Sequence, residues 1–568
     1  MDSDMNYSKY RSGSLKNGIE RAAHRALLYS LGMDKEDLGK PMVAIVNSYN
    51  EIVPGHIHLR ELAEYVKQGV YEAGGIPREF DTIALCDGLC QGHKGMGYPL
   101  PSREIIADSI EMMVEGHQFD AMVMLPGCDK IVPGMLMAAA RLNIPAILVP
   151  GGIMDAGKYQ DMEVVTLTDM RELIGRTQVG KMDLEQLQEA EQCALPTYGT
   201  CAMLGTANSM CSLAEILGMT LPYCGTSRAV SAEKRRQAKQ SGRRIVQMLE
   251  EGLLPRDILT RGTLLNGIAA TMAMGASTNT VLHLMSIANE ANVELTLNDF
   301  DEISRKVPYI CNIKPSGAYP MAVLHDSGGI PAVLKAIEEK LDVSQLTVNG
   351  KTLKENLGQV ELVQDDVIYP VSAPKNEEGG IAVLYGNLAP DGAVVKKSGV
   401  KPSMYYFEGQ ARVFHSMEDA SAAVSNGDIR EGDIIVIRYE GPKGGPGMRE
   451  MHMTTSLLVG RGMDESCALI TDGRFSGSTR GPCIGHISPE AAAGGPIAAV
   501  REGDKIIIDI NRRRLTLNVP QDEIEARLSS VKHVYKKRTP ALAKYAMLVS
   551  SADKGAILNI SAEDGTAK

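Results

Sequence analysis

A cysteine, an aspartate and a lysine stand side by side directly after an apolar run of the sequence. Cys128, Asp129 and Lys130 follow residues 121–125, which predict a buried strand. A thiolate suits iron or zinc and a carboxylate suits magnesium, while a lysine beside a carboxylate can act as a base, a cation or a modified ligand. Two different metals could meet at this loop. The plainer explanation is a buried cysteine beside a solvated ion pair.

Four further residues have a type and a setting that suit chemistry. Cys201 lies where a glycine loop opens into a predicted helix, and the positive end of a helix favours a thiolate or an anionic cluster. Asp87 precedes a glycine, so a hard cation can approach its backbone and carboxylate together. Glu450 follows a glycine-rich loop, and Ser476 lies on a turn after an apolar strand. Each also has a structural explanation, as a small buried residue, an Asx turn, a solvated helix start or a turn residue.

Strands and helices alternate around the first of these residues. Apolar runs predict strands at residues 42–46, 82–85, 121–125 and 146–149, and amphipathic spacing predicts helices at residues 58–73, 103–115 and 134–142. Strands separated by helices pair in parallel, and ligands of such sheets collect at the carboxyl ends of the strands. We therefore predict an α/β layered domain with a parallel sheet that presents Asp87 and Cys128 at one edge.

The second half of the chain has a different character. Helical patterns occupy residues 184–194, 202–217, 231–251 and 267–285, and a polar break with paired glycines follows at residues 374–380. Short strands separated by glycine turns come next, at residues 381–385, 394–397, 411–414, 434–439, 468–471, 505–510 and 515–519. We predict an N-terminal domain of residues 1–372 and a β-rich C-terminal domain of residues 373–568, a barrel or sandwich that carries Glu450 and Ser476.

Composition limits the kinds of partner. The net charge of −11 and the absence of tryptophan argue against a nucleic-acid partner, and no apolar run approaches the length of about 18 residues that spans a bilayer. Ten cysteines in 568 residues are typical of reduced thiols, and we expect a few of them to be metal ligands. We expect a cytoplasmic protein that acts on a small molecule and binds neither nucleic acid nor membrane.

Two short motifs favour other functions but are incomplete. Residues 152–159 nearly match a phosphate-binding loop, but Tyr159 stands where the magnesium-binding Ser or Thr is required. His56 and His58 have a spacing that zinc could use, yet no His-Glu-x-x-His motif accompanies them. We therefore favour neither a nucleotide-binding protein nor a zinc hydrolase.

Taken together, the motifs of the chain resemble the dihydroxy-acid and sugar-acid dehydratase family over nearly the whole length. The segments that carry the resemblance are Asn47-Ser48, Pro99–Glu104, Cys128–Gly134, Gly199–Cys201, Thr471–Gly477 and Ser551–Ala556. The resemblance implies an aconitase-like swivelling β-barrel packed over the N-terminal sheet domain, and a homodimer. It also implies a hydro-lyase that holds an iron-sulfur cluster and Mg²⁺.

The resemblance assigns a role to each candidate residue. It implies that Cys128 and Cys201 hold the cluster, that Asp87, Asp129, Glu450 and a carbamylated Lys130 hold Mg²⁺, and that Ser476 is the catalytic base. A serine can act as a base only if nearby positive charge lowers its pKa strongly.

The third cysteine ligand expected for a [2Fe-2S] cluster is missing. Members with that cluster take it from an Asn-Thr-Cys-Asn loop, which here reads Asn-Ser-Tyr-Asn with Tyr49 in place of the cysteine. Other members lack this cysteine and are associated with a [4Fe-4S] cluster. Both cluster types stay open, with Cys86, Cys90 and Cys193 as possible further ligands.

The resemblance is nearest to the dihydroxy-acid dehydratases. Arg474-Phe475-Ser476-Gly477 and the ending Ser551–Ala556 favour that branch, which implies conversion of 2,3-dihydroxyisovalerate and 2,3-dihydroxy-3-methylvalerate to 2-oxo acids in valine and isoleucine biosynthesis. Gln91, where that branch more often has methionine, keeps a gluconate- or xylonate-type sugar-acid dehydratase as the alternative. An iron-sulfur sensor without turnover is the alternative from another class.

Overall fold

A parallel sheet organises the first part of the chain. The computed structural model describes residues 6–178, 180–363, 365–531, 534 and 536–559. Within these ranges the strand order is β2-β1-β3-β4, and every neighbouring pair is parallel. The strands are β1 (Met42–Asn47), β2 (Ile76–Asp81), β3 (Ala121–Leu125) and β4 (Ala146–Leu148), and the crossover helices are α3 (Leu59–Glu72), α5 (Pro99–Gly116) and α6 (Ile131–Leu142). This arrangement confirms the predicted α/β domain.

The edge strand β2 lies earlier in the chain than predicted. The predicted strand at residues 82–85 is wrong, because the pairing with β1 runs over Ile76–Asp81. β1 and β3 are buried on both faces and are apolar throughout except for the last residue of β1, Asn47. The edge strand instead carries Arg78 and Glu79 and tolerates Pro77. Continuous apolar runs therefore predict the central strands but not the edge strand β2.

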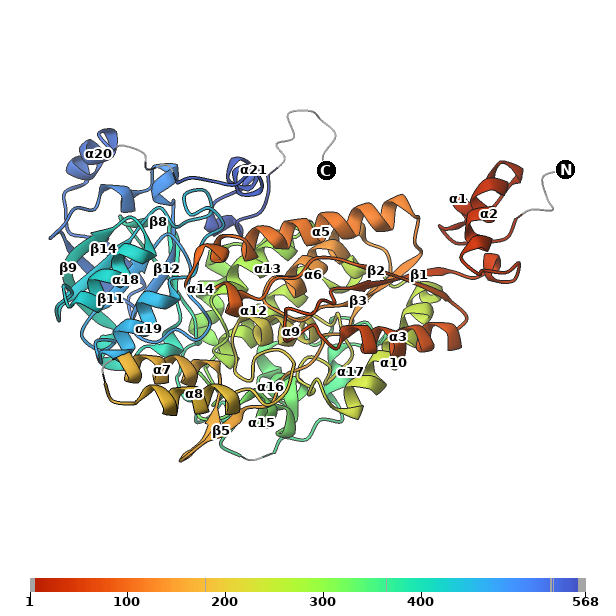
Figure 1. The fold of residues 1–568 in the computed structure, drawn as a ribbon, viewed down its shortest axis with the longest axis horizontal. Helices are drawn as coiled ribbons and strands as arrows, with labels where there is room; N and C mark the ends of the chain where they lie inside the picture. The colour runs from red at the N-terminus through yellow and green to blue at the C-terminus, as the bar shows by residue number, and fades with distance from the viewer. Residues whose placement is uncertain (1–5, 179, 364, 532–533, 535, 560–568) are drawn as a thin grey trace.

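Helices cover both faces of the sheet and extend the N-terminal unit (Figure 1). The predicted helix at residues 267–285 is instead two helices, because Gly275 takes a left-handed conformation with φ of 63° and ends the first. The further helices and the small antiparallel pair are α1 (Gly13–Lys16), α2 (Ala22–Ser30), α4 (Asp87–Cys90), β5 (Gly157–Tyr159), β6 (Met162–Val165), α7 (Leu167–Gln178), α8 (Leu184–Cys193), α9 (Thr206–Ile216), α10 (Ala232–Glu251), α11 (Pro255–Ile258), α12 (Arg261–Met274), α13 (Asn279–Glu290), α14 (Leu297–Lys306), α15 (Met321–Asp326), α16 (Gly329–Ala336) and α17 (Leu353–Leu357).

The C-terminal unit is a closed barrel. In the described part of the chain the barrel order is β10-β11-β12-β8-β7-β14-β13-β9. Its strands are β7 (Ala382–Gly386), β8 (Ala389–Val395), β9 (Tyr406–Phe414), β10 (Asp433–Ile437), β11 (Ala468–Thr471), β12 (Cys483–Ser488), β13 (Lys505–Asp509) and β14 (Arg514–Leu517), with helices α18 (Met417–Asn426), α19 (His452–Gly460), α20 (Gln521–Ser529) and α21 (Pro540–Leu548). All predicted C-terminal strands overlap these strands, while β12, which contains a glycine and a histidine, was not predicted.

The two units lie beside each other along the long axis of the molecule (Figure 1). One buried apolar cluster surrounds the sheet and its helices, and a separate cluster fills the barrel. Loops from both units meet at a cavity that faces the carboxyl ends of β1 and β3. No helix in the described ranges is both long enough and apolar enough to cross a membrane.

Candidate active site

The candidate residues reach one place from distant parts of the chain. Asp87 begins α4, and Asp129 and Lys130 lie in the turn between β3 and α6. Glu450 lies in the loop before α19 of the barrel unit, and Ser476 lies in the loop after β11. The sheet unit thus supplies two carboxylates and an amine, and the barrel unit supplies a third carboxylate and a hydroxyl.

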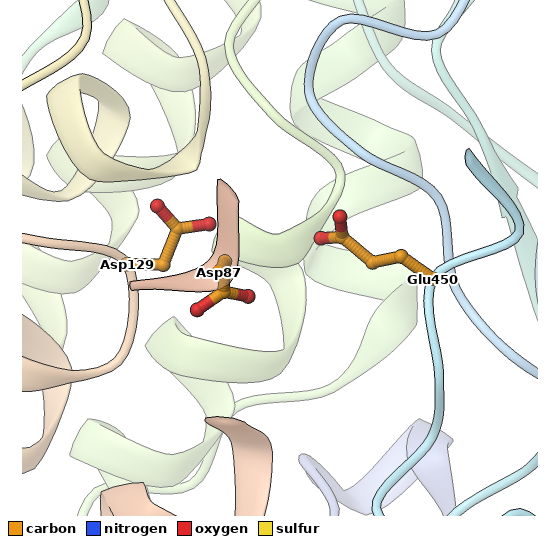
Figure 2. A group of neighbouring side chains, drawn as sticks. All are labelled: Asp87, Asp129 and Glu450. Carbon is orange, nitrogen blue, oxygen red and sulfur yellow. The ribbon is translucent and has the colours of Figure 1, made fainter. Parts of the chain in front are cut away.

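Three buried carboxylates converge between the two units. One oxygen each from Asp87, Asp129 and Glu450 lies within 4.8 Å of the others. Figure 2 shows Glu450 reaching from the barrel side toward the two aspartates of the sheet side. Carboxylate oxygens so close together repel one another unless a cation lies between them or protons bind them. This is the donor set that a hard divalent cation prefers.

Two buried cations neutralise part of this negative charge. The Lys130 Nζ lies 2.8 Å from the Asp87 Oδ2 and 3.6 Å from the Asp129 Oδ2. Arg474 donates to the Asp87 Oδ2 over 3.3 Å and forms an ion pair with Glu450. Burial, and then the charge of Asp87, raise the pKa of Asp129 to about 7. A cation that binds beside Asp129 would therefore displace a proton from this carboxyl near neutral pH.

Free lone pairs remain where a metal would bind. The Asp87 Oδ1 is buried and has no hydrogen-bond partner among the described residues. An unpaired buried carboxylate oxygen is costly, and a divalent cation would satisfy it. The residues therefore fit Mg²⁺, with Lys130 adjacent as an amine in this structure.

Three polar residues that the sequence did not assign fix Glu450. Arg474 pairs with the Oε1, which also accepts a hydrogen bond of 3.1 Å from the Asn279 Nδ2. The Gln91 Nε2 donates to the Oε2 over 2.6 Å. Arg474 lies in the same motif as Ser476, and an arginine two residues before a candidate base is a signal of charge at the site. Asn279 lies far away in the sequence and carried no such signal.

A cavity of about 160 Å³ next to the carboxylates is lined by thiols. Cys86, Cys128 and Cys201 line it together with Asp87 and Asp129. The Cys128 thiol forms a hydrogen bond with Cys86, which lowers the pKa of Cys86, and the same contact together with burial raises the pKa of Cys128. Burial raises the pKa of Cys201 to about 12. Soft sulfur donors around a cavity fit an iron-sulfur cluster.

His56 positions the cysteine of the central loop. Its Nε2 accepts a hydrogen bond of 2.9 Å from the backbone N–H of Cys128, so the ring proton is on the Nδ1, which donates to the backbone oxygen of Ser48 over 2.8 Å. Burial lowers the pKa of His56 to about 4. The His58 Nε2 is hydrogen-bonded to the Gly151 oxygen over 2.7 Å. Both rings thus bind backbone, which explains the histidine pair without zinc.

The motif that resembled a phosphate loop has another structure. Residues 157–159 form the strand β5, and no helix begins there. Lys158 is exposed and pairs with Glu163 at 2.5 Å. Its ammonium therefore does not point into a phosphate-binding loop.

Ser476 lies on the wall of the same cavity and contacts a chain of donors. Its Oγ lies 3.0 Å from the Ser478 Oγ and accepts from the Ser478 N–H over 3.4 Å. The Arg171 Nη1 donates to the Ser478 Oγ over 2.8 Å. The buried Lys396 donates to the carbonyl oxygen of Gly477 over 2.6 Å. The Arg171 guanidinium thus acts on the hydroxyl through Ser478, which favours a serine alkoxide, whereas burial lowers the pKa of Lys396 to about 7.

Comparison with known proteins identifies relatives over both units. The family model described as "Dihydroxy-acid/6-phosphogluconate dehydratase N-terminal" matches residues 40–356, and its C-terminal counterpart matches residues 366–556. Relatives named dihydroxy-acid dehydratase are 50% identical in Methanobrevibacter smithii, 52% in Halothermothrix orenii and 51% in Methanococcus aeolicus. Each alignment covers 96% of this chain and 100% of the relative. These matches confirm the resemblance drawn from the motifs.

Proposed function

The chain belongs to the dihydroxy-acid/6-phosphogluconate dehydratase family and is a hydro-lyase, and from this premise we propose that it dehydrates branched 2,3-dihydroxy acids to 2-oxo acids. The proposed substrates are 2,3-dihydroxyisovalerate and 2,3-dihydroxy-3-methylvalerate, in valine and isoleucine biosynthesis. The observation that carries the proposal is that a group of three carboxylates adjoins a cavity lined by two of them, by thiols and by Ser476.

Each group of residues has a separate task in the proposal. Asp87, Asp129 and Glu450 hold Mg²⁺, with Lys130 joining them if it is carbamylated, and Cys128 and Cys201 hold an iron-sulfur cluster. When bound, Mg²⁺ stabilises negative charge on the carboxylate and the C2 oxygen of the substrate, and the cluster supplies a Lewis acid for the C3 hydroxyl. Arg474 keeps Asp87 and Glu450 together across the boundary between the units.

Ser476 takes the proton from C2 of the substrate. The hydrogen bonds from Ser478, which in turn accepts from Arg171, stabilise the Ser476 alkoxide that must exist before proton transfer. The C2–H electron pair forms the C2–C3 double bond as the C3–O bond breaks, and the hydroxide takes up a proton and leaves as water. The resulting enol then tautomerises to the 2-oxo acid.

The test is turnover by the anaerobically purified protein with reconstituted cluster and Mg²⁺. Formation of 2-oxo acid is compared for 2,3-dihydroxyisovalerate, gluconate and xylonate. A preference for the branched acid supports the proposal, and turnover of none of the acids contradicts it. Loss of turnover in Ser476→Ala, with an unchanged cluster spectrum, rejects an iron-sulfur sensor, because a sensor does not need this hydroxyl.

One observation favours a second candidate, a sugar-acid dehydratase. Arg171 lines the cavity, and within the described residues its hydrogen bonds go to the neutral Ser478 and Gln91 and none to a carboxylate. Such a guanidinium offers free donors to a hydroxylated substrate. The same cavity is also lined by Val53, Leu167 and Met203, which suit a branched alkyl group. Arg171→Leu is expected to reduce kcat/KM for gluconate more than for the branched acid if the second candidate is correct.

The wider setting of the enzyme is also part of the proposal. We place the domain boundary between residues 372 and 373, after α17 and before β7. We expect a cytoplasmic homodimer without nucleic-acid or membrane partners, and size-exclusion chromatography with light scattering tests the oligomeric state.

A further inference from the structure

The loop that would supply a third cluster ligand by resemblance does not face the cavity. Tyr49 stands at the cysteine position, and it is not among the cavity-lining residues. Its hydroxyl donates to the Glu51 Oε1 over 3.2 Å, and the Arg60 guanidinium lies 4.0 Å from its ring centroid. The side chain is thus occupied elsewhere, and two thiolates alone would leave the cluster short of a ligand.

The three remaining candidates differ in where their sulfur atoms lie. Cys86 lines the cavity beside Cys128 and is in hydrogen-bonding contact with it. Cys90 ends the short helix α4 and is not part of the lining. Cys193 is exposed at the end of α8. Of the candidates, Cys86 alone shares a cavity wall with both Cys128 and Cys201 in the described part of the chain.

We propose that Cys86 is the third thiolate ligand of the cluster, in the place of the cysteine missing at Tyr49. The inference rests on the proposed function only in assuming that the cavity holds an iron-sulfur cluster. Three cysteines leave one iron without a protein ligand in a [4Fe-4S] cluster, and an open iron is what the C3 hydroxyl requires.

The position of Cys86 ties the cluster to the magnesium site. Cys86 is the N-cap of α4 in an extended conformation, and Asp87 is the first residue of that helix. A sulfur ligand and a carboxylate ligand therefore come from adjacent residues, as they also do at Cys128 and Asp129. Two such pairs would hold the cluster next to the magnesium site.

The test substitutes serine for each candidate cysteine separately and measures iron, sulfide and the spectrum of the cluster. After anaerobic reconstitution, Cys86→Ser is expected to lower bound iron by about fivefold or more and to change the Mössbauer and EPR signals, because a cluster ligand is lost. Cys90→Ser and Cys193→Ser serve as matched controls and are expected to keep wild-type values. Full iron with an unchanged spectrum in Cys86→Ser, or loss of the cluster in Cys90→Ser, would overturn the proposal.

A second measurement uses the unmodified chain, so it does not depend on the folding of a variant. Anaerobic alkylation with a small reagent, followed by mass spectrometry, compares the cluster-loaded protein with the chelator-treated protein. Cys86, whose thiol has a lowered pKa, is expected to be protected only when the cluster is bound, and the exposed Cys193 is expected to react in both states. Equal labelling of Cys86 in the two states contradicts the proposal.

The two outcomes, ligand and function, can be told apart. Suppose that the wild-type protein holds a cluster but dehydrates none of the acids, and that Cys86→Ser loses the cluster. The ligand assignment then stands and the proposed function fails. If turnover is rapid and Cys86→Ser keeps its cluster, the function stands and the ligand assignment fails.

Discussion

Binding of Mg²⁺ should weaken as the pH falls from 8 to 6, because Asp129 must lose its proton to bind the metal. Burial, and then the charge of Asp87, raise the pKa of Asp129 to about 7 in the metal-free protein. At pH 8 the carboxyl is mostly ionised, and at pH 6 it is mostly protonated. Binding of a metal ion to this carboxylate at pH 6 therefore releases about one proton from Asp129.

The magnitude follows from the ionised fraction. For a pKa of about 7 the ionised fraction falls from about 90% at pH 8 to about 10% at pH 6, so the affinity for Mg²⁺ falls about tenfold, or about 1.4 kcal/mol. An aspartate with an ordinary pKa near 3.9 would change the affinity by only about 1% over this range. Because the pKa of Asp129 is raised in the folded state, the stability of the metal-free protein falls as the pH rises from about 4 to 7. Mg²⁺ binds the ionised carboxylate, so the stabilisation by Mg²⁺ grows over the same range.

Isothermal titration calorimetry of the chelator-treated protein measures this effect. Titrations in two buffers with different ionisation enthalpies give the number of protons released. Asp129→Asn should abolish the pH dependence. Glu215→Gln is the matched control, because Glu215 is a buried carboxyl with a pKa raised to about 7, mainly by burial, and it lies outside the cavity. Equal affinity at pH 6 and pH 8 in the wild type would refute the reasoning.

Three further predictions concern the base, the buried arginine and a helix contact. Ser476→Ala should lower turnover by about 10²–10⁴-fold, the range of general-base catalysis, while iron content and Mg²⁺ affinity stay at wild-type values; a turnover near wild type would exclude it as the base. Arg474→Met should lower the free energy of unfolding of the metal-free protein by about 3–5 kcal/mol in chemical denaturation, because two buried carboxylates lose the guanidinium that pairs with both. A change below about 1 kcal/mol would contradict this. Gly69→Ala should lower the free energy of unfolding by about 1–3 kcal/mol, because its new Cβ would lie 2.0 Å from the backbone oxygen of Lys239 in α10. Gly116→Ala, with nothing within 4 Å of its new Cβ, should leave the thermal midpoint nearly unchanged.

The central strands were predictable because burial on both faces leaves a clear pattern. β3 coincides with the predicted residues 121–125, and β11 coincides with residues 468–471. The edge strand β2 was missed because one edge faces solvent and its sequence is mixed. The break between α12 and α13 depends on the left-handed Gly275, which local helical spacing does not reveal.

The family, the reaction class and the types of residue suited to hold two metals could be predicted from the chain's short motifs, because residue type and spacing within a motif state the chemistry. Which of these residues meet depends on the fold. Asn279 reaches Glu450 across the two units, and Arg474 joins Glu450 to Asp87 of the sheet unit. Cys86 rather than Cys90 or Cys193 lines the cavity. The physical reason is that the direction of a side chain depends on long-range packing, which sequence spacing does not contain.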